Sequence, residues 1–344
     1  MWDAPGVQAS LSVVLVTFNE RSLIERCLPP LLDQLSDGDE LIVADNASSD
    51  GSADAVERLA PRAQLLRLPE NRGYMPACNL AVERARGDLL VMLDTDTIVA
   101  PGFCEAIRRP LARGWAAWMG LVTMDEGRRV NTSGGVVHFT GISWAGGIGE
   151  RVTASEPREV GFASGACLAV TRAEWRRNPG FPPEYFLYFD DVDYSLRVRL
   201  GGGVVGIEPS ARVDHLYDFA RREVKWRLLE RNRWATIVRT YPGELLVLVM
   251  PALMATELAL LAVAARQGWL RQKLLALSDL ARWMPRLLHE RRGLQDARKV
   301  SAKAFAEHLV AELSSPYLGG IGRSRIVRVA LTGYWAAVKW VLER

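Results

Sequence analysis

Two clusters of carboxylates in the chain have the spacing that metal or acid–base chemistry requires. In the first cluster, Asp94 and Asp96 stand in alternate positions directly after the apolar run 89–93, so both side chains can lean towards one cation. A hard cation held by carboxylate oxygens keeps further sites open for phosphate oxygens. Because Asp-x-Asp pairs are common, the weight of this pair rests on its position, which indicates a site for a metal-bound nucleoside diphosphate.

The second cluster consists of Asp190, Asp191 and Asp193, which lie within four residues beside the aromatic run 186–189. Adjacent carboxylates in a partly apolar setting repel each other, so one of them can hold a raised pKa and serve as a general base. The same three aspartates also suit the first turn of a helix, where negative charge complements the dipole. The two interpretations are compatible, because a helix start would fix the carboxylates in space.

Two further segments have both a chemical and a structural interpretation. His215 follows Val213 and Asp214 and is one of only four histidines. Its imidazole could complete a metal site begun by two carboxylates, or it could be an ordinary core or surface residue. The small residues of segment 161–167 could let a substrate approach the backbone closely, or they could form a plain tight turn.

The elements that must position these residues alternate between strand and helix patterns. Short apolar runs at 11–17, 41–44, 64–68 and 89–93 are separated by segments with helical spacing, which predicts a parallel, doubly wound α/β sheet. In such sheets ligands sit outside the carboxyl ends of the strands. Each predicted strand here ends in small polar or acidic residues, so we expect these ends to converge on one crevice.

The ordered set of these strand ends and the second acidic cluster resembles the family 2 inverting glycosyltransferases of the GT-A fold. It is most similar to their bacterial rhamnosyltransferase-like and galactofuranosyltransferase-like branches. The resemblance covers about residues 11–220 and rests on these five segments: Thr17-Phe18-Asn19-Glu20, Asp45-Asn46-Ala47-Ser48-Ser49-Asp50-Gly51, Asn71-Arg72-Gly73-Tyr74 with Asn79, Asp94-Thr95-Asp96, and residues 188–197. It implies a GT-A, Rossmann-like catalytic domain over residues 1–220.

The resemblance also assigns the residues of a nucleotide-sugar site. Asp45 would bond the pyrimidine edge with Ser48 nearby, and Asp94 and Asp96 would hold Mg²⁺ or Mn²⁺, with His215 as a third metal ligand. The residues implied to line the rest of the donor pocket are Thr17, Asn19, Glu20, Asn71, Gly73, Asn79, Asp94 and Thr95.

The chemistry implied by the resemblance is a single displacement with inversion. Asp191 matches the family base, which takes the acceptor hydroxyl proton while the nucleoside diphosphate leaves. Asp190 stands where the family commonly has Glu, so its shorter side chain bears on the orientation of the acceptor. A divalent cation would stabilise the charge that develops on the leaving diphosphate.

Charge divides the chain near residue 220. The net charge is −9 for residues 1–220 and +12 for residues 221–344, which calls for a polyanionic partner of the second part. Residues 221–234 alternate basic and apolar side chains at helical spacing, typical of an amphipathic helix at a lipid headgroup boundary. The basic residues of this stretch are Arg221, Arg222, Lys225, Arg227, Arg231 and Arg233, and they are interleaved with Trp226, Leu228, Leu229 and Trp234.

The run 245–265 contains Glu257 as its only charge and Pro251 inside it. Three interpretations compete: a membrane span, an interfacial helix pair kinked near Pro251, and a soluble helical cap. A span would bury Glu257, and its flanks are basic on both sides, so the interfacial interpretation agrees better with the sequence. Further basic helices are expected over residues 274–288, 302–313 and 327–342.

These features predict an enzyme bound peripherally or monotopically at the cytoplasmic face of the cell membrane, with an anionic membrane surface and a lipid-linked saccharide acceptor as partners. Nucleic-acid binding is disfavoured, because a long apolar run has no use on a phosphate backbone. The first ten residues lack a secretory pattern. The four scattered cysteines, which form no C-x-x-C pair, fit a reducing compartment.

The first expectation for the donor is dTDP-L-rhamnose, on resemblance alone, with a UDP-galactofuranose or UDP-hexose donor as the alternative. A nucleotidyltransferase is disfavoured, because no Gly-rich basic loop follows the first strand. A processive synthase is also disfavoured, since segment 230–234 only partly matches the Gln-x-x-Arg-Trp motif of such enzymes. A catalytically inactive, membrane-surface nucleotide-binding scaffold is the alternative from another class.

Overall fold

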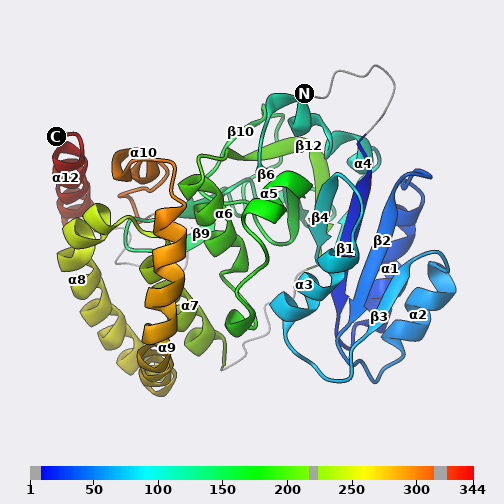
Figure 1. Ribbon diagram of the computed structural model, residues 1–344, viewed down its shortest axis with the longest axis horizontal. Helices are drawn as coiled ribbons and strands as arrows, with labels where there is room; N and C mark the ends of the chain where they lie inside the picture. Colours follow the sequence, from blue (N-terminus) through cyan, green and yellow to red (C-terminus); the bar gives the residue numbers. More distant parts are fainter. Residues whose placement is uncertain (1–8, 217–223, 314–323) are drawn as a thin grey trace.

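The computed structural model describes residues 9–216, 224–313 and 324–344. The expected boundary between residues 220 and 221 lies outside the described residues, and so do Arg221 and Arg222 and most of the N-terminal segment. One large mixed sheet runs through residues 9–216, and a group of later helices lies at the opposite end of the molecule from α1 (Arg21–Leu32) and α2 (Ser52–Leu59) (Figure 1).

The N-terminal half of the sheet is parallel, as the alternating pattern predicts. β1 lies between β2 and β4, and β3 pairs with the outer side of β2. Every residue of β1 and β4 is buried, because both faces of these strands are covered. The strands are β1 (Leu11–Thr17), β2 (Glu40–Asp45), β3 (Gln64–Arg67) and β4 (Leu89–Leu93). The helices between them are α1 (Arg21–Leu32), α2 (Ser52–Leu59) and α3 (Tyr74–Arg84).

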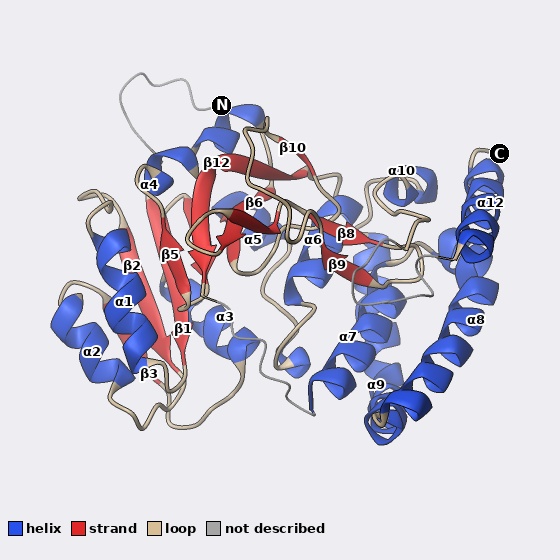
Figure 2. Cartoon of the chain, turned by 180° about the vertical axis from the view of Figure 1, so that it is seen from behind, coloured by secondary structure: helices blue, strands red, loops and turns tan. Residues whose placement is uncertain are grey.

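The second half of the sheet is mixed, in the order β10-β12-β6-β11-β4. β11 runs antiparallel to β4 and β6, β12 runs parallel to β6, and β5 pairs antiparallel with the end of β12. A separate two-stranded sheet lies beside them (Figure 2). The strands are β5 (Thr97–Val99), β6 (Ala117–Met124), β7 (Arg129–Thr132), β8 (Gly135–Val137), β9 (Ser143–Ala145), β10 (Arg158–Glu159), β11 (Cys167–Thr171) and β12 (Val205–His215). The α-helices here are α4 (Phe103–Ala106), α5 (Arg172–Arg177) and α6 (Asp190–Leu200).

The first and third helices of the helical region pack against each other, and both contact α6 of the sheet domain. The helices of this region are α7 (Val224–Thr240), α8 (Gly243–Gln267), α9 (Leu270–Asp296), α10 (Ala302–Ala306) and α12 (Arg325–Leu342). The expected helix over 302–313 is wrong beyond residue 306. There Val310 bridges to His138 and accepts a hydrogen bond from Phe139, so tertiary pairing overrides the helical pattern.

The interpretation of α7 as a lipid-facing amphipathic helix is wrong for its buried arginines. Arg231 and Arg233 are 8 % and 2 % exposed, so their side chains face the protein. Arg233 pairs with Glu230 and Glu257, at 3.0 and 2.8 Å. These buried arginines thus interact with groups inside the protein. A buried charge without a partner would strongly destabilise the fold.

The outer side of α8 is an exposed apolar surface. α8 is long and apolar enough to span a bilayer by length and composition, yet only 11 % of its most apolar 18-residue stretch is buried. Its single internal acid, Glu257, turns inward, where Lys273 at 2.6 Å and Trp234 at 2.9 Å also contact it. The outward side chains of α8 therefore carry no charge between Glu244 and Arg266.

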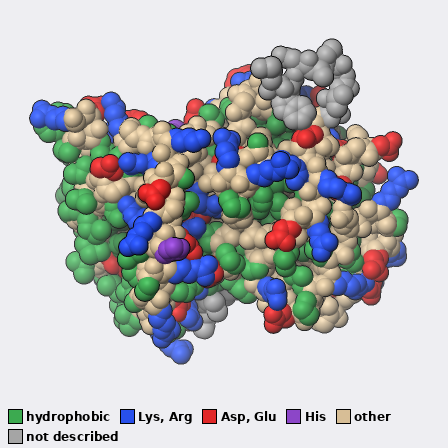
Figure 3. Space-filling model, viewed as in Figure 1, with side chains coloured by type: hydrophobic (Ala, Val, Ile, Leu, Met, Phe, Trp, Pro, Cys, Tyr) green, Lys and Arg blue, Asp and Glu red, His purple; other side chains and the backbone are tan. Residues whose placement is uncertain are grey.

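α12 continues this surface, because Tyr334 donates a hydrogen bond to the Leu248 carbonyl of α8 at 2.5 Å. We call the outer faces of α8 and α12 together the apolar face. Hydrophobic side chains gather over these helices at the left edge of the molecule in Figure 3. Its most exposed members are Val247, Met254, Leu258, Ile326, Val329 and Trp340.

Candidate active site

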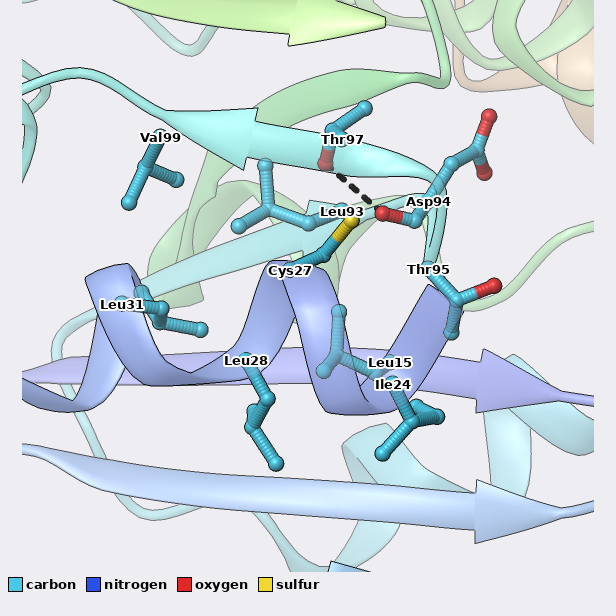
Figure 4. A pocket seen from close by; sticks show the side chains of 10 residues that line it. All are labelled: Leu15, Ile24, Cys27, Leu28, Leu31, Leu93, Asp94, Thr95, Thr97 and Val99. Atoms are coloured by element: carbon cyan, nitrogen blue, oxygen red, sulfur yellow. Dashed lines mark hydrogen bonds between the residues drawn. The ribbon is translucent and has the colours of Figure 1, made fainter. Parts of the chain in front are cut away.

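Asp94 lies directly after the end of β4, next to a group of apolar side chains from α1 and β4. The Thr97 hydroxyl donates to the Asp94 carbonyl at 2.7 Å, which turns the chain sharply after the strand. Figure 4 shows Ile24 and Cys27 of α1 below this turn, while the Asp94 carboxylate points away from them. The strand end therefore presents the carboxylate to the crevice and leaves the apolar side chains to the core.

The pairing of β12 with β5 brings His215 to this turn, although His215 lies 119 positions after Asp96 in the chain. His215 lies opposite Thr97 in the ladder, and its Nε2 is 3.0 Å from Asp96 Oδ1. Asp94, Asp96 and His215 each offer a ligand atom, and these atoms all lie within 4.8 Å of one another. The structure thus brings together the three residues predicted to hold a metal.

The electrostatics of this cluster fit a divalent cation. Burial, with the neighbouring Asp96 charge, raises the pKa of Asp94 to about 7, and His215 opposes this shift. Burial of His215 lowers its pKa, but the hydrogen bond and charge of Asp96 outweigh it, so the pKa of His215 lies above its ordinary value. Two carboxylates and an imidazole form an oxygen-rich donor set suited to Mg²⁺ or Mn²⁺, whose charge would offset this repulsion.

The second acidic cluster opens α6 and meets the first through a short segment before β11. The backbone N–H of Gly165 donates to Asp191 Oδ2 at 3.1 Å, and the next residue, Ala166, accepts the N–H of Asp94. A Cβ at position 165 would lie 3.3 Å from Asp190 Oδ2, so glycine leaves room for the acidic pair. The Asp94 backbone and the Asp191 carboxylate therefore contact consecutive residues of one segment, and the Asp191 charge also raises the pKa of Asp94.

Both carboxylates of the pair carry raised pKa values. Burial raises the pKa of Asp191 to about 6, against the lowering effect of hydrogen bonds from Gly165 and Val192. Burial and the adjacent Asp191 charge hold the pKa of Asp190 well above its usual range. A carboxylate with a pKa near 6 is ionised at neutral pH yet basic enough to accept a proton, as general-base catalysis requires.

The end of β2 offers an acceptor without a partner in the described chain. Asp45 is 4 % exposed; Oδ2 accepts the Ser48 N–H at 3.2 Å, and Oδ1 has no hydrogen bond within the described residues. The buried Thr17 hydroxyl, at the end of β1, lies beside the Glu20 carboxylate and lowers its pKa. Because buried polar groups are rarely left unsatisfied, Asp45 Oδ1 fits the polar edge of a nucleotide base. Asn19, with φ 56°, bonds Ser48 and Ser49 and shapes the loop between the two strand ends.

Glu20 and Thr95 join the β1 end to the β4 end. The Thr95 hydroxyl donates to Glu20 Oε2, and burial raises the pKa of Glu20 above its ordinary value. Both residues stand beside the metal-ligand cluster, since the Asp96 charge also raises the pKa of Glu20. The sites predicted separately on β1 and β4 therefore lie together.

The predicted residues of segment 71–79 contact other parts of the chain. Asn71 Oδ1 accepts from Gly73 N at 2.9 Å and from Asn46 Nδ2 at 3.0 Å. The amide of Asn79 exchanges two hydrogen bonds with the backbone of Phe181, at 2.8 and 2.9 Å. In this structure these side chains fix the loops around the crevice, and Asn46, quoted in the motif but given no role of its own, links the β2 end to the 71–73 turn.

Residues 185–189, directly before the acidic pair, form a strained segment that the sequence did not reveal. Phe186 has φ 64° and ψ −52°, and the Leu187 N–H donates to the Tyr185 carbonyl at 2.7 Å, which defines a γ-turn with positive φ. Tyr188 and Phe189 also have positive φ, 70° and 68°. Such conformations cost about 1–3 kcal/mol each and persist only where the surroundings enforce them.

Gly73 packs directly against Phe186 of this segment. Its φ is +90°, and a Cβ there would lie 2.5 Å from the Phe186 ring. The N–H of Tyr74 donates to the Phe186 carbonyl at 2.9 Å. Glycine is therefore required for the start of α3 to reach the 185–189 segment, which joins the predicted nucleotide side of the crevice to the predicted base.

A mixed sheet of this order, with carboxylates at the ends of its parallel strands, is that of the GT-A fold. The fold agrees with a solved structure, that of GalNAc-T7 with UDP, GalNAc and Mn²⁺, at a TM-score of 0.58. That match has 15 % identity and covers 69 % of this chain and 49 % of the other, so it shows the fold alone. Residues 12–174 match the family model of glycosyl transferase family 2. The chain carries a family 2 glycosyltransferase domain and is a transferase.

Relatives of known description agree with this family. An N-acetylglucosaminyl-diphospho-decaprenol L-rhamnosyltransferase of Mycobacterium tuberculosis (strain ATCC 25618 / H37Rv) is 29 % identical over 233 residues, which cover 60 % of this chain and 75 % of that protein. The succinoglycan biosynthesis protein ExoO of Rhizobium meliloti (strain 1021) is 32 % identical over 108 residues, which cover 31 % of this chain and 30 % of that protein.

Proposed function

We propose that this protein is a metal-dependent, inverting glycosyltransferase that moves a sugar from a pyrimidine nucleoside diphosphate to a hydroxyl of a lipid-linked saccharide. The first donor we propose is dTDP-L-rhamnose, and UDP-galactofuranose or a UDP-hexose is the alternative. One observation carries the proposal. The backbone N–H of Asp94 donates to the Ala166 carbonyl, and the Asp191 carboxylate accepts the N–H of the preceding residue, Gly165.

The donor would be held by the strand ends. Asp45 Oδ1 is available to accept the N–H of a pyrimidine edge, and Thr17 lies at the adjacent end of β1. Asp94, Asp96 and His215 would hold Mg²⁺ or Mn²⁺, which supplies Lewis-acid stabilisation of the leaving diphosphate.

The base would act from the start of α6, across the crevice from the donor. Asp191 accepts the proton of the acceptor hydroxyl as that oxygen attacks the anomeric carbon, and the bond from this carbon to the diphosphate oxygen breaks. Asp190, buried next to it, would orient the acceptor. General-base catalysis of this kind raises the reaction rate about 10²–10⁴-fold, and the fixed positions of donor and acceptor raise it further.

A lipid-linked acceptor agrees with the apolar face and with the relative from Mycobacterium tuberculosis, which is named as an N-acetylglucosaminyl-diphospho-decaprenol L-rhamnosyltransferase. Val247 is 73 % and Leu258 is 69 % exposed on α8. An exposed apolar surface of this extent marks an interaction site. We propose that it lies in one leaflet, so that the enzyme is monotopic at the cytoplasmic face of the cell membrane, with basic residues such as Arg325 and Arg328 at anionic headgroups.

The test uses the purified full chain, Mg²⁺ or Mn²⁺ and a panel of dTDP-rhamnose, UDP-galactofuranose, UDP-glucose and UDP-N-acetylglucosamine. Released nucleoside diphosphate is measured with and without a polyprenyl-diphosphate-linked N-acetylglucosamine acceptor. We expect release with one donor that needs both the metal and the acceptor. Nucleotide binding without acceptor-dependent release from any donor would count against the proposal and favour an inactive scaffold.

A further inference from the structure

We propose that Asn232 of α7 is a positioning residue for the acidic pair that opens α6. Its side-chain amide holds three backbone carbonyls of the strained 185–189 segment, so that Asp190 and Asp191 keep their orientation. The inference rests on the proposed role of Asp191 as base. It goes further by making a helix beyond the family-matched region part of the catalytic apparatus.

The contacts of the Asn232 amide are unusually concentrated. The two N–H groups of Nδ2 are shared among the carbonyls of Tyr185, Leu187 and Tyr188, which lie 3.2, 3.0 and 2.9 Å from Nδ2. Asn232 is 0 % exposed, so bulk solvent does not reach these bonds. Arg231 Nε donates to Asn232 Oδ1 at 3.0 Å, which fixes the direction of the amide, because each side of it faces groups of the opposite hydrogen-bonding type.

The three carbonyls lie on or next to the residues with positive φ, which are Phe186, Tyr188 and Phe189. Tyr185 supplies the acceptor of the γ-turn centred on Phe186, and Tyr188 has positive φ itself. Backbone conformations of this kind revert to common ones when the contacts that enforce them are lost. Phe189, the N-cap residue of α6, follows directly, so any relaxation would pass to the first turn of the helix that carries the acidic pair.

The rest of the α7 face supports the same role. Thr236 shares a hydrogen bond with the Tyr185 hydroxyl at 2.9 Å, and Arg239 donates to Asp193 Oδ1 at 2.7 Å. Positions 232, 236 and 239 share one face of the helix, and all three contact the segment or the first turn of α6. Asn232 is the member of this face that holds the backbone itself.

The test compares Asn232→Leu, which removes the donors, with Asn232→Ser, which can keep one. The matched control is Gln295→Leu, because the Gln295 amide also donates to two α7 carbonyls, those of Arg239 and Thr240, both at 3.3 Å, at the far end of the helix. Release of nucleoside diphosphate is measured with the donor and acceptor that the wild type uses, across pH 5–9.

We expect kcat to fall about 10–100-fold in Asn232→Leu and less in Asn232→Ser, because small displacements of a base cost this much. The donor KM should stay within about threefold of wild type, and the acidic limb of the pH profile should move. Amide hydrogen exchange of residues 185–191 should quicken at least about tenfold in Asn232→Leu and stay unchanged in the control.

Folded Asn232 variants with wild-type kcat, pH profile and exchange would overturn the inference. A lower thermal midpoint with wild-type kcat would also overturn it, since the residue would then be structural only. If Asn232→Leu does not fold, Asn232→Ser decides by the same criteria. Failure of the proposed function itself looks different, because Asp191→Asn would then keep its turnover, whatever the Asn232 variants do.

Discussion

The replacement Asp191→Asn tests the chemistry of the crevice with little change of shape. Oδ2 and Oδ1 of Asp191 accept the N–H groups of Gly165 and Val192 at 3.1 and 2.8 Å, and the single oxygen of an amide can keep one of these two bonds. It cannot take a proton from an acceptor hydroxyl. Because general-base catalysis contributes about 10²–10⁴-fold, we expect kcat to fall by that factor, which corresponds to about 3–5 kcal/mol in the barrier.

The thermal stability of this variant should change little. Burial raises the folded-state pKa of Asp191 to about 6 from an ordinary value of 3.8. The ionised carboxylate therefore destabilises the fold above about pH 6, and this effect is absent below the unfolded-state pKa. An uncharged amide removes this penalty and gives up one of the two backbone hydrogen bonds, so the two effects should offset and the thermal midpoint of Asp191→Asn at pH 7.5 should stay close to that of the wild type. In the wild type itself, kcat should fall as the pH drops through about 6, because the base becomes protonated.

The assay follows nucleoside diphosphate release at saturating donor and acceptor, and calorimetry with the matching nucleoside diphosphate and Mn²⁺ measures donor-site binding. Binding should stay within about threefold of wild type. Asp88→Asn is the matched control, since Asp88 lies just before β4, at the opposite end of this strand from Asp94. Its carboxylate accepts a hydrogen bond from the Ser10 hydroxyl. If Asp191→Asn turns over within threefold of the wild type, the reasoning about the base is refuted.

Three further predictions follow from the site and the apolar face. Asp96→Ala should weaken Mn²⁺-dependent binding of the nucleoside diphosphate at least about tenfold and abolish turnover, measured by calorimetry and product release; unchanged metal dependence would contradict the metal assignment. Gly73→Ala should lower the free energy of unfolding by about 1–3 kcal/mol in denaturant titration, because φ is +90° and the Phe186 ring lies 2.5 Å from the added Cβ; wild-type stability would show that the backbone relaxes freely. Val247→Glu with Leu258→Glu should reduce sedimentation with anionic liposomes at least about tenfold at unchanged thermal midpoint; undiminished sedimentation would exclude the apolar face as the membrane contact.

Local pattern was sufficient for the parallel half of the sheet. The runs 11–17 and 89–93 coincide with β1 and β4, because strands buried on both faces are continuous apolar segments that end where polar residues begin. The same pattern predicted Asp94 and Asp96 at a strand end. Their shared cation site needed only the geometry of alternate positions.

The mixed half could not be read in this way. Nothing local indicates that β12 returns antiparallel to β5 and brings His215 within 3.0 Å of Asp96. Only the resemblance to a family suggested that pairing. The 185–189 segment is likewise invisible in the sequence, since positive φ at aromatic residues has no compositional signal and depends on contacts with distant residues such as Asn232.

The basic C-terminal region shows how composition can mislead. Arg231 and Arg233 have the spacing of a headgroup-facing helix, but their partners are acidic or carbonyl groups within the protein. Charge counting does not reveal which partner a charge has. Because α7 holds the 185–189 segment, removal of the chain after residue 220 would disturb the site as well as the apolar face, and point variants on α8 separate the two effects.

The central claim is that one crevice holds both the metal-bound diphosphate and the base. An anomalous difference map at the manganese edge, from crystals grown with Mn²⁺ and the nucleoside diphosphate of the donor, tests it most directly. We predict a single peak that the Asp96 and His215 side chains and the diphosphate share, on the side of Asp94 that faces Asp191. A bound nucleotide with no manganese at these residues, or manganese on a face remote from Asp191, would contradict the claim.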